Sequence, residues 1–274
     1  MKQPDRNRPI RVMGIVNITD DSFYADSRML EAGAVASDRL VGRVGAMLDE
    51  GADLIDIGAC STRPGSSGVG AEEEWRRLEP ALQALRSVFP TLSFSVDTYW
   101  SEVVRRCYDR FGPFTVNDIT AGMADPAMLP LTGKLGLPYI AMHMRGMPAD
   151  MQLLTDYPDG VTGAVAAYFD EFAVRAEEAG VTDWILDPGF GFAKTVEQNW
   201  TLVRELPALL RFGRPLLVGV SRKSMLTRPL GITPAEALPA TTALHLALLQ
   251  NGADILRVHD VAEAVRTVSI YRML

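Results

Sequence analysis

Eight short apolar segments recur along the chain, and each is bounded by polar residues or by glycine. Segments of this length that are rich in Val, Ile and Leu are typical of buried β-strands. The pattern predicts strands at Arg11–Asn17, Asp53–Gly58, Leu92–Asp97, Phe114–Asp118, Pro138–His143, Trp184–Asp187, Pro215–Val220 and Asp254–Val258.

Longer segments between these strands carry apolar residues at the three- and four-residue spacing of an amphipathic helix. The predicted helices are Val35–Glu50, Glu72–Val88, Ser101–Arg110, Pro126–Leu135, Val161–Ala179, Val196–Leu210, Ala235–Asn251 and Val261–Arg272. Four of them are followed at once by a glycine, namely Gly51, Gly136, Gly180 and Gly252. Glycine just past the last turn is a common signal of a helix end.

Eight strand-then-helix units predict an α/β fold of the TIM type, a (β/α)8 barrel with parallel strands and right-handed connections. No shift in composition marks a second domain, so we expect a single domain over residues 1–274, with its core at about 11–270. The structural rival is a doubly wound open sheet. Its GxGxxG turn is absent after the first strand, where residues 14–19 read GIVNIT.

Composition narrows the class of protein further. A chain of 274 residues, 47% of them apolar, can bury a large core without disulfides or metal. The net charge of −7 argues against a nucleic-acid partner. Cys60 and Cys107 form neither a CxxC pair nor a Cys/His cluster, which is typical of a reduced, cytoplasmic protein without a zinc site. We see neither a signal peptide nor an apolar run that would span a membrane.

Polar residues occupy the carboxyl ends of the predicted strands, which is where TIM barrels carry their chemistry. They are Asn17, then Ser61, Thr62 and Arg63, then Asp97, then Asn117 and Asp118, then His143, then Asp187, then Ser221, Arg222, Lys223 and Ser224, and finally Arg257 and His259. One such residue is often only a helix cap. Polar groups at all eight ends are costly to bury unless they pair or meet a ligand, so we expect one converging site.

The residue types divide this site into two parts. Asp97, Asp187 and Asn117 offer acceptors that suit a flat heterocycle with ring N–H and amino donors. Arg63, Arg257 and His259 suit an anion, because guanidinium groups match phosphate oxygens and His259 precedes a predicted helix.

The other two histidines have structural interpretations. His245 lies in an apolar helical stretch, where we expect packing or a surface position. His143 lies between two methionines, which favours a buried core histidine over a direct functional role.

Eight short motifs fall in order at the eight strand ends, and together they resemble the dihydropteroate synthase family of pterin-binding barrels. The resemblance covers about residues 11 to 270. The motifs are Met13–Phe23, Asp56–Gly58 with Ser61–Gly65, Ser95–Thr98, Asn117–Ile119, Met142–Gly146, Leu186–Phe192, Ser221–Ser224 and Arg257–Asp260. Each motif alone is weakly specific, whereas the ordered set is strongly specific.

The resemblance implies an enzyme of folate biosynthesis that joins 6-hydroxymethyl-7,8-dihydropterin diphosphate to p-aminobenzoate. Diphosphate would leave first, and the amine of p-aminobenzoate would attack the resulting pterin cation. The loops after the first two strands would close over the site and exclude water. The resemblance also implies Mg²⁺ as cofactor, with Asn17 as its protein ligand, and a homodimer formed through helices away from the site.

Roles for individual residues also follow from the resemblance. The implied pterin ligands are Asp97, Asn117, Met142, Asp187, Lys223 and Arg257, with Met142 packing on the ring and Arg257 stacking over it. The implied diphosphate ligands are Asn17, Thr62, Arg63, Arg257 and His259. The implied p-aminobenzoate pocket contains Thr62, Pro64, Phe190, Lys223 and Ser224. The implied catalytic residues are Asp97, Lys223, Arg257 and His259, with Asp97 stabilising the positive ring.

Three positions depart from the family pattern. Asp20 stands where proline is frequent, Ala59-Cys60 where Gly-Glu is common, and Ala193 where glycine is frequent. None of these residues has an assigned chemical role, so the departures bear on the loops and not on the reaction.

Other functions fit part of the pattern. A pterin-dependent methyltransferase that acts on a corrinoid protein would share the carboxylate and amide contacts, but it would have little need for the anion-binding rim or for Ser221–Ser224. A non-catalytic pterin-binding barrel would be expected to lack some catalytic side chains, and all are present. A phosphate-binding barrel of sugar metabolism explains the rim but not the acceptor-rich pocket.

Overall fold

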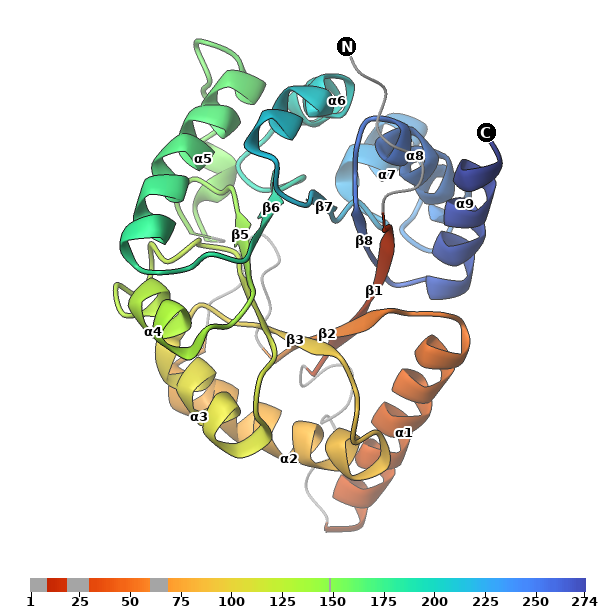
Figure 1. Cartoon of the computed structure of the whole chain (residues 1–274). Coiled ribbons are helices and arrows are strands. Elements are labelled where there is room, and N and C mark those ends of the chain that lie inside the picture. Colours follow the sequence, from red (N-terminus) through yellow and green to blue (C-terminus); the bar gives the residue numbers. More distant parts are fainter. Residues whose placement is uncertain (1–8, 19–29, 60–68, 148) are drawn as a thin grey trace.

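Eight parallel strands curl into a nearly closed barrel. The computed structural model describes residues 9–18, 30–59, 69–147 and 149–274. The strands are β1 (Arg11–Asn17), β2 (Leu54–Gly58), β3 (Phe94–Asp97), β4 (Thr115–Asp118), β5 (Tyr139–Met142), β6 (Trp184–Asp187), β7 (Leu217–Val218) and β8 (Ile255–Val258). Their order in the sheet is β6-β5-β4-β3-β2-β1-β8-β7. An isolated bridge between Leu186 and Leu216 brings the two end strands together (Figure 1).

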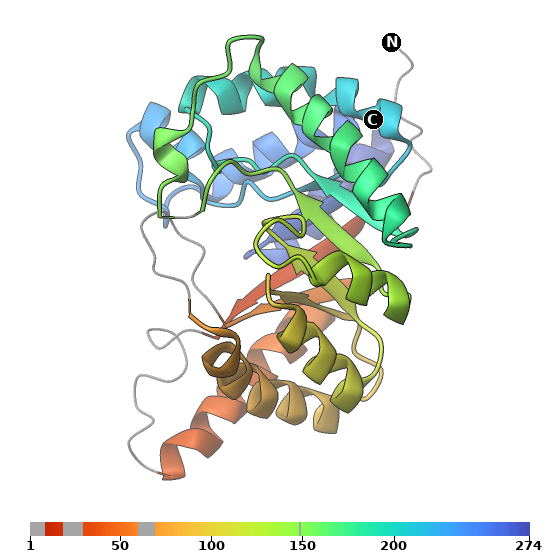
Figure 2. The same ribbon diagram turned by 90° about the vertical axis from the view of Figure 1, so that its left-hand side faces the viewer.

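Helices surround this barrel. They are α1 (Leu30–Asp49), α2 (Ala71–Val88), α3 (Ser101–Phe111), α4 (Met128–Leu135), α5 (Val161–Glu178), α6 (Val196–Glu205), α7 (Ser224–Leu230), α8 (Leu238–Gln250) and α9 (Val261–Met273), with short 3₁₀ helices η2 (Met151–Leu153) and η3 (Leu206–Phe212). Figure 2 shows α5 and α6 on one side of the sheet and α2 and α3 on the opposite side. None of the described helices is long and apolar enough to cross a membrane.

The predicted barrel is confirmed strand by strand, with strand ends that differ from the expected ones by at most two residues. The four glycines expected after helix ends all have positive φ, from 64° to 108°. The expected helix Val196–Leu210 instead changes at Leu206 into η3, because Pro207 lacks the N–H that an α-helix needs there. The short helix α7 was not predicted, since seven residues that include Pro229 show no helical period.

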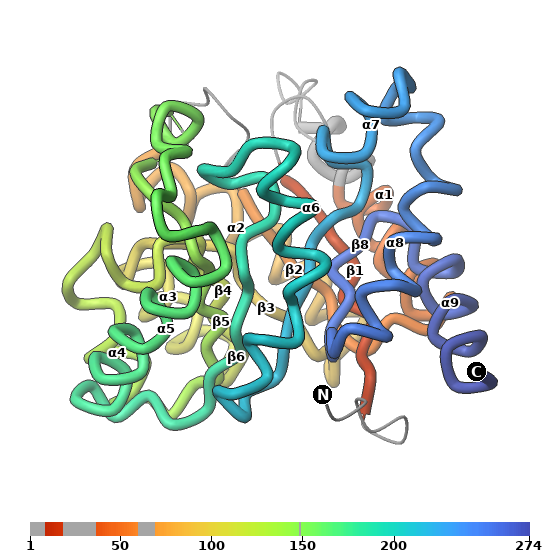
Figure 3. The backbone as a smooth tube through the Cα atoms, turned by 90° about the horizontal axis from the view of Figure 1, so that it is seen from above, coloured from red at the N-terminus to blue at the C-terminus, as the bar shows by residue number. Residues whose placement is uncertain are grey.

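Side chains that point into the barrel form an apolar layer beneath a polar layer. The apolar layer consists of Met13, Leu54, Ile140, Ile185, Leu217 and Ile255. Residues two positions apart on a strand point to the same face. Asp56, Asp187 and Arg257 each lie two positions after a member of the apolar layer, so the polar layer occupies the carboxyl end of the barrel. Figure 3 shows α7 at this end and the start of β1 at the other.

His245 lies inside the molecule on α8, as a packing residue. Among the described residues neither ring nitrogen has a hydrogen-bond partner, and burial lowers the pKa of His245 from 6.5 to about 4. The unfolded chain therefore takes up a proton between those values that the folded protein does not, so His245 reduces stability as the pH falls from 6.5 towards 4.

We expect His245→Leu to raise the free energy of unfolding by about 1 kcal/mol at pH 7, because the unpaired imidazole is removed. At pH 5 the gain should be about 2 kcal/mol larger, from the proton uptake that no longer occurs. Urea unfolding of both proteins at the two pH values measures this. The buried His143 contributes the same pH dependence of stability to both proteins, so its contribution cancels in the difference. An equal difference at both pH values would contradict the assigned environment of His245.

Candidate active site

The register of the sheet places three expected site residues in one row. Asn17 pairs with Gly58, Gly58 with Asp97, and Asp97 with Asn117. A Cβ on Gly58 would lie 3.3 Å from Cβ of Asp97 and 3.7 Å from Oδ1 of Asn17. The bare α-carbon therefore leaves a space between these side chains. On the other side of the barrel, Met142 pairs with Asp187.

Arg257 and two carboxylates form the charged centre of the site. Nε of Arg257 donates to Oδ2 of Asp56 at 2.7 Å, and Nη2 lies 2.6 Å from Asp56 Oδ2 and 3.0 Å from Asp97 Oδ2. Asp56 also accepts hydrogen bonds from Ser95 Oγ at 2.5 Å and from Asn117 Nδ2 at 3.1 and 3.2 Å. We had assigned Asp56 no role from the sequence, although it follows Leu54 at the spacing of an inward-pointing residue.

Burial controls the charge of the acceptor pocket. It raises the pKa of Asp97 to about 7, an effect that the charge of Asp56 increases and that Arg257 opposes. Burial also raises the pKa of Asp187, against the nearby charge of Lys223 and a hydrogen bond from Gly189 N at 2.8 Å. The positive charges near Asp97 and Asp187 only partly offset their burial. Such a pair of carboxylates favours a ligand that brings N–H donors or a positive charge.

Lys223 stands beside this pocket. Its Nζ donates to the carbonyl oxygen of Phe190 at 2.5 Å and lies 4.8 Å from the ring centroid of Phe192. Burial lowers the pKa of Lys223 to about 8, and Asp187 opposes the shift. Lys223 is therefore mostly charged at neutral pH and can donate to a ligand oxygen or nitrogen. The side chain of Phe190 itself is buried in the core.

His259 lies at the anion-binding side of the site. Its Nδ1 is 3.0 Å from Ser221 Oγ, and its carbonyl oxygen accepts a hydrogen bond from Arg43. Burial, and then the charge of Arg257, lower the pKa of His259 to about 4. The sequence groups His259 with Arg63 and Arg257 as residues that suit an anion, but in this structure it is a neutral imidazole near pH 7. An anion beside it would raise its pKa again.

His143 belongs to a structural network, as the core interpretation expected. Its Nδ1 lies 2.9 Å from Nζ of Lys194, which also donates to the carbonyl oxygens of Gly189 at 2.9 Å and Phe192 at 3.0 Å. Burial lowers the pKa of His143 to about 2 and that of Lys194 to about 7. The sequence did not single out Lys194, which holds the loop after β6 in place.

Segments that follow β5, β6 and β7 line a polar cavity of about 380 Å³. Its lining consists of Gln152, Thr155, Gly191, Lys194, Thr195, Val196, Asn199, Ser224 and Arg228. Ser224, an expected p-aminobenzoate residue, is exposed at the start of α7 and borders this cavity. Ala193, the departure from a frequent glycine, is buried in the same loop and has a φ of 50°, a value that favours glycine.

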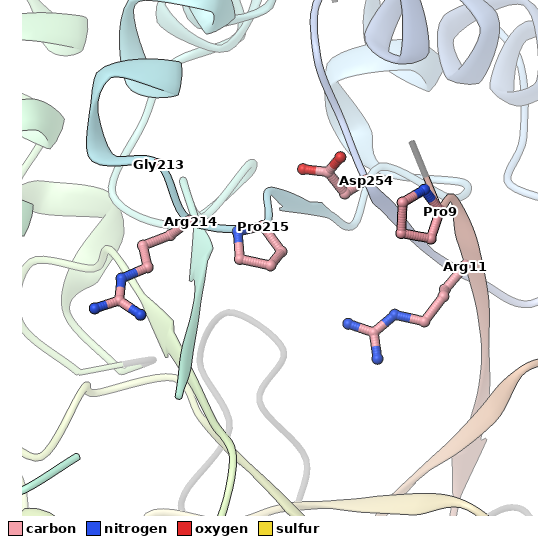
Figure 4. A pocket seen from close by; sticks show the side chains of 6 residues that line it. All are labelled: Pro9, Arg11, Gly213, Arg214, Pro215 and Asp254. Atoms are coloured by element: carbon pink, nitrogen blue, oxygen red, sulfur yellow. The ribbon is translucent and has the colours of Figure 1, made fainter. Parts of the chain in front are cut away.

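A second hollow lies at the opposite end of the barrel, at the starts of β1 and β8 and the approach to β7 (Figure 4). Pro9, Arg11, Gly213, Arg214, Pro215 and Asp254 line it. Asp254 Oδ2 accepts the Leu216 N–H at 2.8 Å and Arg214 donates to the Thr182 carbonyl at 2.7 Å, so these side chains hold the strand starts. The polar strand ends lie at the carboxyl end of the barrel, and we take that end as the active site.

Part of the expected site falls outside the described residues. Thr62, Arg63 and Pro64 lie there, as do Asp20 and Cys60. Within the described ranges, the His, Cys, Asp and Glu side chains form no group of three or more that could hold a metal ion. Asn17 remains the expected metal ligand, half-buried at the end of β1.

Comparison with known proteins covers nearly all of this chain. The family described as pterin binding enzyme matches residues 13–259. Dihydropteroate synthase of Synechocystis sp. is 43% identical over 253 residues, which are 91% of this chain and 85% of that protein. The structure of Yersinia pestis dihydropteroate synthase with a sulfonamide drug has a TM-score of 0.86 and 37% identity, and the match covers 98% of this chain and 95% of that one. The Xanthomonas albilineans dihydropteroate synthase with 4-aminobenzoic acid has a TM-score of 0.85 and 37% identity, with coverage of 98% and 93%.

Proposed function

This chain belongs to the dihydropteroate synthases, within the family of pterin-binding enzymes, and from that membership we propose how its own residues bind and join the two substrates. The enzyme is a transferase that condenses 6-hydroxymethyl-7,8-dihydropterin diphosphate with p-aminobenzoate, giving 7,8-dihydropteroate and diphosphate in folate biosynthesis. The observation that carries the residue assignment is the convergence of Asp97, Asn117, Asp187 and Lys223 at the carboxyl end of the barrel.

The pterin ring occupies the acceptor pocket in this proposal. Asp97, Asp187 and Asn117 accept hydrogen bonds from the ring N–H and amino groups, and Lys223 donates to a ring acceptor. Met142, buried opposite Asp187 in the sheet register, packs against the ring. Arg257 spans the region between the ring and the diphosphate.

The reaction breaks the C–O bond between the pterin methylene and the diphosphate, and the diphosphate keeps the electron pair. Arg257 and His259, with Thr62 and Arg63, stabilise the growing negative charge on that side. The charge of Asp97 stabilises the positive ring that remains. The amine of p-aminobenzoate then forms the C–N bond and loses one proton.

The p-aminobenzoate lies near the start of α7 in this proposal. Ser224 is exposed there, between Lys223 and the polar cavity, and its hydroxyl can donate to the substrate carboxylate. The Lys223 ammonium donates a hydrogen bond to the Phe190 carbonyl, which fixes its position. In this position the same lysine borders both substrates. Thr62 and Pro64 complete the pocket.

The test is a synthesis assay with the pterin diphosphate, Mg²⁺ and labelled p-aminobenzoate. We expect labelled dihydropteroate and diphosphate in equal amounts, and a loss of about 10²-fold or more in kcat/KM for Lys223→Ala, because a charged donor to the bound ring is removed. Lys134→Ala, an exposed lysine on α4, is the control. Tight pterin binding without product would overturn the synthase assignment in favour of a methyltransferase or a non-catalytic barrel.

Asn17 fits the expected Mg²⁺. Its amide oxygen faces the space over Gly58, next to Asp97, and Mg²⁺ commonly uses one or two protein oxygens together with water and substrate phosphates. When bound, Mg²⁺ would neutralise charge on the departing diphosphate. Asn17 and the Arg257 side of the site would hold the metal–diphosphate unit in place.

Three measurements test this assignment. A chelator should abolish the synthesis and added Mg²⁺ should restore it. Asn17→Ala should raise the Mg²⁺ concentration for half-maximal rate by about tenfold, the effect of one lost ligand contact of about 1.4 kcal/mol. Calorimetric binding of the pterin without its diphosphate should stay as in the parent protein, and a weakened affinity there would assign Asn17 to the ring instead.

The proposal includes a homodimer. Its support is a pair of exposed apolar side chains on α9, a helix that packs against α8. Ile270 and Met273 are 52% and 83% exposed on α9, away from the strand ends that form the site. Light scattering should give twice the chain mass of 29.9 kDa, and Ile270→Glu should lower it.

The proposal also places the enzyme in the cytoplasm. Cys107 is a free thiol, buried in the core, and burial raises its pKa to about 12. An unpaired, unreactive thiol is typical of reducing compartments. Cell fractionation of the tagged full chain would test this location.

A further inference from the structure

Asp56 accepts hydrogen bonds from three side chains, and two of them belong to the proposed site. The carboxylate lies fully buried on β2, with no contact to solvent. Ser95, Asn117 and Arg257 are its partners, at 2.5 to 3.2 Å. These partners come from β3, β4 and β8, so one carboxylate connects four strands across the floor of the site.

The contact with Asn117 determines which way its amide points. A carboxylate can only accept hydrogen bonds, so the amide must turn Nδ2 towards Asp56, at 3.1 and 3.2 Å from its two oxygens. The opposite orientation would bring two acceptors together. Oδ1 of Asn117 is therefore directed away from Asp56, where it can accept a hydrogen bond from a bound ring.

The contact with Arg257 selects which of its donors remain for a ligand. Nε donates to Asp56, and Nη2 is shared between Asp56 and Asp97. In the part of the chain that the structure describes, no acceptor is recorded for Nη1 of Arg257. One edge of the planar guanidinium is thus fixed on the two carboxylates. The N–H groups of Nη1 are directed away from those carboxylates.

We propose that Asp56 is a positioning residue that presents Asn117 as an acceptor to the pterin ring and Arg257 as a donor towards the diphosphate. This inference rests on the proposed function of the site. Asp56 touches neither substrate in it. It sets specificity for a ring with an N–H or amino donor facing Asn117, because the amide cannot turn over without losing its bond to a buried carboxylate.

Asp56→Asn tests the inference, because it keeps the shape of the side chain and removes the charge that fixes both partners. We expect kcat/KM for the pterin diphosphate to fall by about 10- to 100-fold, as for the loss of a charge-assisted hydrogen bond. Calorimetric affinity for 6-hydroxymethylpterin, which lacks the diphosphate, should fall by a similar factor. KM for p-aminobenzoate should change by less than about threefold, because none of the three partners of Asp56 borders that pocket.

Asp118→Asn is the matched control. The sequence places Asp118 among the polar strand ends, but on β4 it points to the opposite face from Asn117. It is equally buried and accepts hydrogen bonds from Tyr139 OH at 2.6 Å, Thr120 and Gly122, and it bonds to no proposed substrate ligand. We expect it to lose stability and to keep its pterin affinity. Equal losses of pterin affinity in both variants would show general damage to the barrel and overturn the inference.

Ser95→Ala is a second variant in case Asp56→Asn does not fold. It removes the 2.5 Å hydrogen bond that restrains Asp56 and leaves the charge in place. We expect pterin affinity to fall about two- to fivefold with p-aminobenzoate KM unchanged, and no change in pterin affinity would overturn the inference. If the parent protein itself does not bind the pterin, the proposed function fails. If the parent binds and turns over but Asp56→Asn equals it, the positioning role alone fails.

Discussion

Asp97→Asn is expected to lower kcat/KM for the pterin diphosphate by about 10²- to 10³-fold, the range found when one group that stabilises developing charge is removed. Asparagine keeps the size of the side chain and one acceptor oxygen, but it replaces the second acceptor by an NH2 donor and cannot balance a positive ring. Asp97 lies beside Asn117 in the sheet register and shares Arg257 with Asp56, so its charge lies at the centre of the site.

The pH dependence provides the sharper readout. Burial raises the pKa of Asp97 to about 7, so the effective carboxylate form increases as the pH rises through neutrality. We expect kcat/KM of the parent enzyme to rise from about pH 6, to pass a maximum between the pKa values of Asp97 and Lys223, and to fall above pH 8 as Lys223, with a pKa of about 8, loses its proton. The Asp97→Asn variant should lack the rise and keep the fall. Steady-state assays at varied pterin diphosphate measure both. Parallel profiles would contradict the role of Asp97.

Asp53→Asn is a suitable control for that experiment. Asp53 lies just before β2 at the other end of the barrel, where its Oδ2 accepts the Val12 N–H at 2.7 Å. The substitution removes an aspartate that anchors the start of a strand, at the end of the barrel opposite to the proposed site. We expect kcat/KM of this variant to stay within about twofold of the parent enzyme, since surface changes of this kind have small effects.

Much of the fold could be predicted because the barrel repeats one pattern. Apolar strands and amphipathic helices alternate throughout, and each strand ends in a polar residue or is followed by one within a few positions, so the eight strand ends could be located without a structure. The alternation within strands also identifies inward-pointing residues. Ile185 followed by Asp187 and Ile255 followed by Arg257 both read as an apolar residue beneath a polar one.

The parts that could not be predicted depend on contacts between distant segments. Asp56 is a single acid in an apolar strand, and its partner Arg257 is 201 positions away. Lys194 gains its role only when the loop after β6 closes on His143. The left-handed φ of Ala193 follows from the shape of that same loop, and its one sign in the sequence is that alanine stands where glycine is frequent in the family.

Gly189→Ala should have the largest effect on stability, a loss of about 3 kcal/mol or more. Gly189 has a φ of 68°, where a side chain costs about 1–2 kcal/mol. A Cβ on Gly189 would also lie 2.0 Å from the carbonyl oxygen of His143, a backbone atom that cannot rotate away. Overpacking of this kind adds about 1–3 kcal/mol. Thermal and urea unfolding measure the sum.

Gly136→Ala separates the two causes. Gly136 ends α4 with a φ of 64°, and a Cβ there would meet nothing within 4 Å. It carries the backbone strain without the collision, so the difference between the two variants measures the contact with His143. If Gly189→Ala is no less stable than Gly136→Ala, the loop after β6 does not pack on the end of β5 as the structure has it.

Activity should fall together with stability in Gly189→Ala, because the loop and the acceptor pocket share bonds. Gly189 N donates to Oδ1 of Asp187 at 2.8 Å, and its carbonyl accepts from Lys194 at 2.9 Å. Moving Gly189 away from His143 therefore displaces Asp187, a proposed ligand of the pterin. Pterin affinity measured well below the unfolding temperature should drop by about tenfold or more, while Gly136→Ala, whose glycine lies on the far side of α4 from the site loops, should bind as the parent does.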